Sequence, residues 1–204
     1  MKIMPHRIAI LILAAGASTR MGQPKQLLPW KDTTLLGHAI QTAKSTDAIE
    51  VVTVLGANAK LIQSQIKEEV IFIQNTAWQS GLGGSIACGT EWLLQSNIEF
   101  DGILITLADQ PLIDFKYLDK LISTFSEHTD RIIASTYRNR AGVPALFPKK
   151  YVNTLLKLDE DFGAKHLLEQ EQDTIITIPA ENRISDVDTE EDYKQLKNKN
   201  EFEN

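Results

Sequence analysis

Short apolar runs rich in β-branched residues alternate with segments of helical spacing along most of the chain. The pattern predicts strands at residues 8–13, 51–55, 70–73, 102–107 and 131–135, and helices between them at 35–43, 59–68, 85–94 and 115–125. Strands that alternate with helices in this way are typical of a mostly parallel sheet whose two faces are covered by helices. The predicted fold class is therefore α/β, in three layers.

The last third of the chain has a weaker pattern. It predicts a short strand at 145–147, a helix at 163–169, a strand at 174–178 and a terminal helix at 189–197 with Thr189 as its N-cap. No linker, repeat or low-complexity tract interrupts the sequence, so residues 1–204 are expected to form a single domain. The polar tail, residues 198–204, is expected to fray.

Composition narrows the classes of partner. Acidic residues outnumber basic ones and give a net charge of -6, which supplies no basic footprint for duplex nucleic acid and no long-range attraction to anionic membranes. The apolar run at residues 8–15 is shorter than the ~20 residues of a membrane span. A single cysteine, Cys88, excludes a disulfide within the chain and fits a reducing compartment. We therefore expect a cytoplasmic protein with no nucleic-acid or membrane partner.

The loop after the first predicted strand has the residue types of a phosphate-binding loop. It reads Leu13-Ala-Ala-Gly-Ala-Ser-Thr-Arg-Met-Gly-Gln-Pro-Lys-Gln-Leu-Leu28. Its small residues let the backbone approach a ligand closely, and Ser18 with nearby backbone N–H groups can cradle phosphate oxygens. Arg20 and Lys25 add two cations. In open α/β sheets the ligand site lies at the carboxyl ends of the strands, where this loop begins.

Two common nucleotide-binding motifs are absent from the chain. A P-loop requires four residues between its two glycines and a lysine after the second, whereas five residues separate Gly16 from Gly22 and Gln23 follows. A dinucleotide fingerprint begins at Gly81-Leu-Gly83, but Ile86 stands where the third glycine belongs. These departures argue against a P-loop NTPase and against an NAD-dependent dehydrogenase.

A second loop, residues 75–85, follows the third predicted strand and leads into a helix. Its glycines would let a base or ribose pack against backbone, Ser85 can hydrogen-bond, and the helix N-terminus favours an anion or a polar base edge. Trp78 suits either a core anchor or a ligand contact. A plain turn that caps the helix would have the same composition.

Asp109 follows the apolar strand at 102–107 and is the best single candidate for a metal ligand. A carboxylate at the end of a buried strand needs a partner, and Mg²⁺ binds one or two carboxylates together with phosphate oxygens. Asp186 and Asp188 are spaced i, i+2, so on an extended segment they share one side. Asp188 and Thr189 also suit the start of a helix.

Taken together, these segments resemble the MobA-like nucleotidyltransferases, and most closely the molybdenum cofactor cytidylyltransferase branch. The first loop matches L-A-A-G-x-S-x-R-M-G-x-P-K-x-L-L, the second is similar to N-x-x-W-x-x-G-L-x-S-S, and the segments D-Q-P and D-I-D-T-P-E-D have counterparts here. The resemblance spans nearly the whole chain. It implies a Rossmann-like fold of the glycosyltransferase-A type, with residues 1–110 as the NTP-binding half and residues 111–197 as the acceptor-binding half.

The resemblance also implies residue roles. Arg20 and Lys25 would contact the triphosphate, with Lys25 at the α-phosphate. The segment that contains Asp188 and Asp186 would bind metal, with Asp188 preferred. Gly142-Val-Pro-Ala-Leu-Phe147 and Asp161-Phe-Gly-Ala-Lys-His-Leu-Leu168 resemble the segments that line the acceptor pocket.

The chain departs from the family pattern at several positions. Gly83 and Gly84 replace the usual serines, and Ala87 stands where many members carry a basic residue. Lys165 replaces an arginine, which keeps the charge but loses the bidentate fork. Arg138 and Arg140 are interpreted as solvated surface charges.

The candidate residues fall into four groups. Those with a catalytic role are Lys25, Arg20 and Asp109; those that bind nucleotide are Leu13, Ala14, Ala15, Gly16, Ser18, Arg20, Lys25, Asn75, Gly81, Gly83, Ser85 and Asp109. Those that bind the acceptor are Gln110, Gly142, Pro144 and Lys165, and those that bind Mg²⁺ are Asp109, Asp188 and Asp186.

The function implied is transfer of CMP from CTP to the molybdopterin form of molybdenum cofactor, with release of pyrophosphate. The implied partners are then an NTP and a phosphorylated small molecule. The resemblance also allows a molybdoenzyme partner that receives the product, without identifying it. A guanylyltransferase or a sugar- or polyol-phosphate nucleotidyltransferase is the nearest alternative. A non-catalytic cofactor-binding or insertion protein is the alternative from another class, although Arg20, Lys25 and Asp109 are all present.

Overall fold

The computed structural model describes residues 6–137, 140–158 and 163–202. Its main sheet has the strand order β5-β4-β1-β6-β8-β7-β9. The strands are β1 (Ile8–Ala14), β4 (Glu50–Leu55), β5 (Ile71–Gln74), β6 (Gly102–Leu107), β7 (Ile132–Tyr137), β8 (Arg140–Pro148) and β9 (Ile175–Pro179). Neighbouring strands are parallel except at β8, which runs antiparallel to both β6 and β7.

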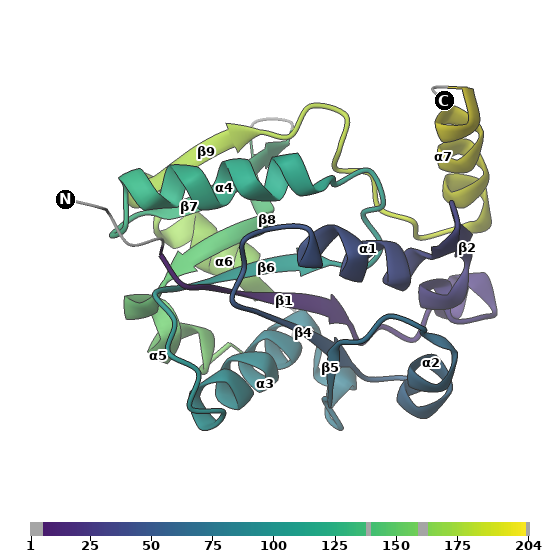
Figure 1. Ribbon diagram of the computed structural model, residues 1–204, viewed down its shortest axis with the longest axis horizontal. Coiled ribbons are helices and arrows are strands. Elements are labelled where there is room, and N and C mark those ends of the chain that lie inside the picture. The colour runs from purple at the N-terminus through teal and green to yellow at the C-terminus, as the bar shows by residue number, and fades with distance from the viewer. Residues whose placement is uncertain (1–5, 138–139, 159–162, 203–204) are drawn as a thin grey trace.

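Helices cover both faces of this sheet, as Figure 1 shows. They are α1 (Leu35–Lys44), α2 (Ala59–Gln65), α3 (Leu82–Gln95), α4 (Phe115–Glu127), α5 (Val152–Leu155), α6 (Gly163–Gln170) and α7 (Glu190–Phe202). Short 3-10 turns lie at Thr19–Met21, Lys25–Leu27, Trp78–Ser80, Lys149–Tyr151 and Gln172–Thr174. A small hairpin of β2 (Pro29–Trp30) and β3 (Thr33–Thr34) leads into α1. The predicted α/β class with a mostly parallel sheet is confirmed.

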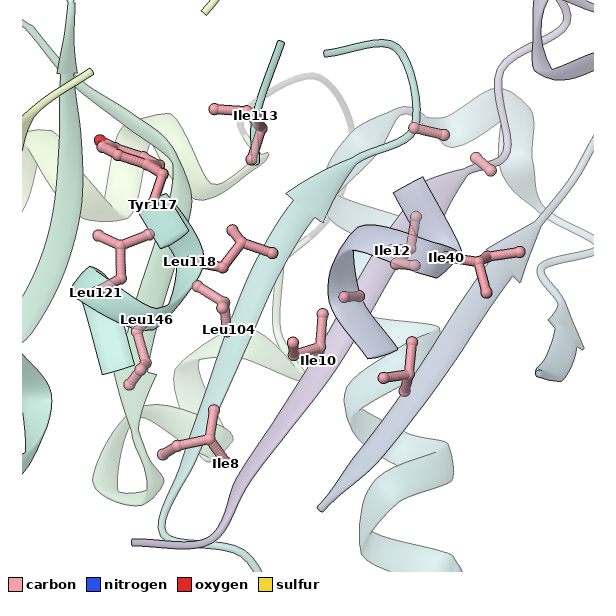
Figure 2. Close-up of a cluster of buried hydrophobic side chains, with 14 of the residues drawn as sticks. Ile8, Ile10, Ile12, Ile40, Leu104, Ile113, Tyr117, Leu118, Leu121 and Leu146 are labelled. Carbon is pink, nitrogen blue, oxygen red and sulfur yellow. The ribbon is translucent and has the colours of Figure 1, made fainter. Parts of the chain in front are cut away.

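The central strand β1 explains why the core has two halves. All seven of its residues are buried, and successive side chains point to opposite faces. Ile8, Ile10 and Ile12 belong to a cluster with residues of α1 and α4, part of which Figure 2 shows. Ala9 and Leu11 point the other way, into a cluster with residues of α3 and α6. The strand is apolar on both faces because helices cover both.

Most predicted elements are found, with shifts at their ends. α1 begins after Thr34, whose side chain accepts a hydrogen bond from the Gly37 N–H, and β6 has the predicted bounds. α2 ends at Gln65 rather than at residue 68. α7 starts after Thr189, which exchanges hydrogen bonds with Asp192, and continues to Phe202, so residues 198–202 are helical where fraying was predicted.

Two elements differ more strongly from the prediction. β8 is nine residues long, whereas the sequence indicated a strand only at 145–147; glycine and proline early in this strand obscure its pattern. α3 begins at Leu82, ahead of the predicted start at 85, because Gly81 adopts φ 94° and turns the chain into the helix. Among the described residues, no helix is long and apolar enough to cross a bilayer.

Candidate functional site

A cavity of about 320 Å³ lies at the carboxyl ends of β1 and β6. The backbone N–H of Ala108 donates to the carbonyl of Leu13 and ties these two strand ends together at 3.1 Å. The cavity is lined by Leu13, Ala14, Ala15, Gly16, Lys25, Gln26, Trp78, Gln79, Gly81, Leu82, Ser85, Leu107, Ala108 and Asp109. The first loop, the glycine-rich second loop and the Asp109 segment therefore surround one space, as their positions after parallel strands lead one to expect.

Lys25 lies at the centre of the charged groups. Its Nζ donates to Asp109 Oδ2 at 2.5 Å, to the carbonyl of Val187 at 2.9 Å and to Asp188 Oδ1 at 3.0 Å. An ammonium group has three donors, so these contacts satisfy all of them. Burial lowers the pKa of Lys25, but the two carboxylates outweigh burial and raise that pKa above its ordinary value. Lys25 therefore keeps its positive charge here.

Asp109 is largely buried, with 19% of its side chain exposed. Burial raises the pKa of its carboxyl, Lys25 opposes the rise, and the negative charges of Asp186 and Asp188 add to it. Its Oδ1 is buried and accepts no hydrogen bond from the described residues. An unpartnered carboxylate oxygen is a group that a bound cation would satisfy. The donor set thus fits a divalent cation, although no three His, Cys, Asp or Glu side chains within the described residues gather as a metal site.

The segment from 186 to 188 crosses the site beside Asp109. The Val187 N–H donates to the carbonyl of Asp109 at 2.9 Å. Asp188 faces Lys25, and its Oδ2 lies 3.9 Å from Arg20 Nη1. Asp186 instead accepts a hydrogen bond from Gln110 Nε2 at 2.9 Å. Two carboxylates, those of Asp109 and Asp188, therefore converge on one point, and the third is held to one side.

Gln26 fixes the shape of the first loop, a role that the sequence analysis did not assign. It is 3% exposed, and its Nε2 donates to the carbonyls of Ala14 at 2.8 Å and Gly16 at 2.9 Å. Its Oε1 accepts a bond from the Ser18 hydroxyl. The loop therefore folds around a buried amide, which satisfies carbonyl groups that would otherwise face the interior unpaired.

Replacing Gln26 with leucine should destabilise this loop. Leucine is similar in size but cannot donate, so two carbonyls lose their partner and the free energy of unfolding should fall by about 2–4 kcal/mol. Urea denaturation of wild type and Gln26→Leu measures the change. Gln23→Leu, at an exposed position of the same loop, should change stability by less than about 0.5 kcal/mol; equal losses in the two variants would contradict the role of the Gln26 amide.

Four predicted nucleotide-binding residues do not line the cavity. The Ser18 hydroxyl accepts a bond from the Lys25 N–H at 3.0 Å and so supports the loop internally. Arg20 is exposed beside Asp188. Asn75 is buried and donates to the Ser85 hydroxyl at 3.1 Å, and Gly83 lies buried in the first turn of α3. Asn75 thus orients Ser85, which does line the cavity.

A second, larger cavity of about 830 Å³ adjoins the first. Leu82 and Leu107 line both, so the two spaces share a wall. The second cavity is lined by Leu82, Leu107, Gln110, Tyr137, Arg140, Ala141, Gly142, Val143, Gly163, Ala164, Lys165, Ile184 and Asp186. Three predicted acceptor residues, Gln110, Gly142 and Lys165, are therefore among its lining.

The remaining acceptor predictions divide. Pro144 is buried and its carbonyl accepts a bond from the Ser135 hydroxyl at 2.6 Å, while its neighbour Val143 lines the cavity. Arg140 was interpreted as a solvated charge; it is exposed but also lines this cavity. Arg138, Asp161 and Phe162 lie outside the described residues. Two cations, Arg140 and Lys165, and one carboxylate, that of Asp186, line the space, so the charged side chains that line it are net positive and suit an anionic ligand.

Comparison with known proteins finds a family, a relative and a solved structure that each match most of this chain. The model of the MobA-like NTP transferase domain matches residues 10–175. A protein of Paenarthrobacter nicotinovorans named nicotine blue oxidoreductase is 31% identical, over 91% of this chain and 94% of its own length. The crystal structure of an Rv0371c homologue from Mycobacterium sp. strain JC1 is 27% identical, with a TM-score of 0.80 over 95% of this chain and 96% of that one.

A further similar structure contains a metal. Rv0371c of Mycobacterium tuberculosis, solved in complex with manganese, is 26% identical to this chain. It superposes with a TM-score of 0.76 over 94% of this chain and 98% of that one.

Proposed function

The chain belongs to the MobA-like NTP transferase family, and from that premise we propose that it transfers CMP from CTP to the molybdopterin form of molybdenum cofactor. The observation that carries the proposal is the convergence of Lys25, Asp109 and Asp188 beside the smaller cavity, which Lys25 and Asp109 line and which shares Leu82 and Leu107 with the larger one. The smaller cavity would hold the nucleotide, and the larger one the acceptor. Gln110, Gly142 and Lys165 line the larger one, which is why we assign the acceptor to it.

The chemistry requires little beyond positioning and charge stabilisation. An acceptor phosphate oxygen attacks the α-phosphorus of the NTP, the bond to the bridging oxygen breaks, and pyrophosphate leaves with the electron pair. The attacking oxygen is already anionic, so no general base is needed. Lys25 would neutralise charge on the α-phosphoryl group as it moves between the two oxygens.

Mg²⁺ is the cation that we propose for the site. Asp109 and Asp188 would hold it, with Asp186 as a further candidate, and phosphate oxygens of the nucleotide would complete its shell. When bound, it would supply charge stabilisation to the triphosphate. The unpartnered Oδ1 of Asp109 supports a divalent cation at this place, and the similar protein Rv0371c has been solved in complex with manganese.

The deciding experiment measures pyrophosphate release with CTP, GTP, UTP and ATP, each with and without molybdopterin cofactor and Mg²⁺. Release that needs CTP and the cofactor would support the proposal. Release with another NTP, or with a sugar or polyol phosphate, would keep the chemistry and replace the substrates. A folded protein that releases no pyrophosphate would contradict nucleotidyl transfer and favour a non-catalytic cofactor-binding protein.

One relative carries the name of an oxidoreductase, so the same samples should be tested for redox activity with a nicotinamide cofactor. The dinucleotide fingerprint is incomplete because Ile86 occupies its third glycine position. We therefore expect no oxidation of NADH or NADPH by this chain. Nicotinamide-dependent reduction without pyrophosphate release would overturn the transferase proposal.

Two glycines allow the donor and acceptor assignments to be tested separately. Gly16 lines the smaller cavity and Gly142 the larger one. A Cβ placed on either would meet nothing within 4 Å, and neither has a positive φ. Gly16→Val and Gly142→Val should therefore fold normally while each fills part of one cavity.

Each substitution should affect one substrate. A clash worth about 1–3 kcal/mol corresponds to about 5- to 150-fold in affinity, so Gly16→Val should raise the KM for NTP by that factor and Gly142→Val the KM for acceptor. Steady-state kinetics with each substrate varied in turn measures both constants. If both variants raised the same KM, the assignment of two cavities to two substrates would be wrong.

A further inference from the structure

A third apolar cluster lies behind the carboxylates, apart from the two clusters on the sheet faces. We call it the rear cluster; it contains Met21, Leu28, Trp30, Leu35, Val187 and Leu196, with Leu112 and Tyr193 packed against it. Its members come from the first loop, the β2–β3 hairpin, the start of α1, the 186–188 segment and α7. In Figure 1, α7 stands beside β2 at one end of the molecule, away from the main sheet.

Helix α7 is attached to the molecule through this cluster. Of the α7 side chains that the structure describes, Leu196 is the only one that is buried, with 6% exposed. The Tyr193 hydroxyl donates to the carbonyl of Pro29 at 2.6 Å and so fastens the helix to the hairpin. A 13-residue helix is marginal in isolation and depends on packing for its stability. The position of α7 is therefore set by Leu196 and Tyr193.

The same cluster contains the residue between the two site aspartates. Val187 is fully buried, donates through its N–H to the Asp109 carbonyl, and accepts through its own carbonyl from Lys25 Nζ. Any displacement of Val187 must move Asp188 relative to Lys25. Met21 and Leu28, on either side of Lys25 in sequence, belong to the same cluster, so it holds both partners of the ion pair from behind.

We propose that α7 braces the catalytic centre and that Leu196 is a positioning residue for Asp188, acting through Val187. This inference rests on the proposed function for its effect on catalysis. Leu196 lines neither cavity; its buried side chain belongs to the same apolar cluster as Val187, the residue between the two aspartates. Truncating Leu196 leaves every charged side chain present in the protein. It should, however, let the position of Asp188 relative to Lys25 vary more.

The test compares Leu196→Ala with two matched variants. Leu196→Met restores the volume, and Lys199→Ala changes an exposed position of the same helix. In Leu196→Ala, the Mg²⁺ concentration for half-maximal rate should rise about 10- to 100-fold, as it does when the support of a metal ligand is lost. The KM for NTP should stay within about twofold. Leu196→Met and Lys199→Ala should behave like wild type.

Hydrogen–deuterium exchange supplies a readout that does not depend on activity. In Leu196→Ala, backbone amides of residues 186–189 should exchange faster than in wild type, while those of β1 and β6 should not change. Tyr193→Phe, which removes only the bond to Pro29, should give the same pattern to a smaller degree, and it serves if Leu196→Ala does not fold. Unchanged exchange at 186–189 would overturn the brace.

The two proposals fail in different ways. A wild-type protein whose amides at 186–189 exchange slowly but which transfers no nucleotide would contradict the proposed function. The bracing role of α7 would then be decided by comparing hydrogen–deuterium exchange in wild type and Leu196→Ala. A different result in Leu196→Ala would be hydrogen–deuterium exchange that is faster throughout the protein, with every kinetic constant impaired. That result would mean that α7 supports the whole fold, and it would overturn a positioning role.

Discussion

Asp109→Asn is expected to lower kcat/KM for nucleotidyl transfer about 10³-fold, because the charge stabilisation that a bound cation supplies is worth several kcal/mol. The amide keeps the size of the side chain and can still accept a hydrogen bond from Lys25 Nζ, but it removes the negative charge that attracts a cation. The unpartnered Oδ1 is the atom most affected. Initial rates of pyrophosphate release with NTP varied, at several Mg²⁺ concentrations, measure the loss.

Asp101→Asn is the matched control for this variant. Asp101 flanks the other end of β6, where it pairs with Arg7, so the two substitutions make the same chemical change at opposite ends of one strand. Asp101→Asn should leave kcat/KM near the wild-type value. If Asp109→Asn retained wild-type activity, or if both variants lost activity alike, Asp109 would have no role in cation binding.

The strands at the centre of the fold could be predicted from sequence because their signal is local. β1 is a continuous apolar run and β6 is interrupted by a single polar residue, Thr106, because burial on both faces favours apolar side chains along the strand. β8 could not be predicted at its full length. It is held by hydrogen bonds to β6 and β7, and such pairing depends on tertiary context rather than on the propensity of residues such as Gly142 and Pro144.

The charged residues of the site could also be anticipated, since each follows a predicted strand or stands in a recognisable loop. The residues that hold them in place could not. Gln26 acts through hydrogen bonds to backbone carbonyls, and its sequence neighbours give no sign of that role. Val187 reads as one apolar residue between two acids, and its contacts with Asp109 and Lys25 join parts of the chain far apart in sequence.

Ser18 shows a second role that its residue type did not indicate. A hydroxyl in a glycine-containing loop beside two cations favours a phosphate contact, yet its oxygen accepts from the Lys25 N–H and donates to Gln26. Composition indicates that a loop can bind phosphate, but it does not say which polar groups the loop uses to hold its own shape. The residue types were therefore informative about the site and less so about individual contacts.

Lys25→Ala is expected to lower kcat about 10²- to 10³-fold, the usual cost of removing a donor that stabilises charge in the transition state. The dissociation constant for NTP should change by less than about 10-fold, since Arg20 and the loop backbone remain. Rapid-quench measurement of the chemical step and equilibrium NTP binding separate the two effects. Equal losses in both would mean that Lys25 contributes ground-state binding alone.

Arg20→Ala provides the comparison for the other cation of the loop. Arg20 is 74% exposed and lies 3.9 Å from Asp188, so an exposed ion pair worth at most about 1 kcal/mol is lost and KM should rise less than about 10-fold. A larger loss of kcat in Arg20→Ala than in Lys25→Ala would reverse the assignment of the two residues.

Lys25→Ala should have a second effect, opposite in sign, on cation binding without nucleotide. In the structure, the Lys25 ammonium neutralises Asp109 and Asp188 and occupies the place where their oxygens converge. Without nucleotide, a divalent cation that uses these same two oxygens must displace the ammonium, so removing the ammonium should tighten Mn²⁺ binding, measured by electron paramagnetic resonance on the protein alone. The variant would then bind the metal better and turn over more slowly. Weaker Mn²⁺ binding in Lys25→Ala would show that Lys25 and the cation do not compete for the two carboxylates.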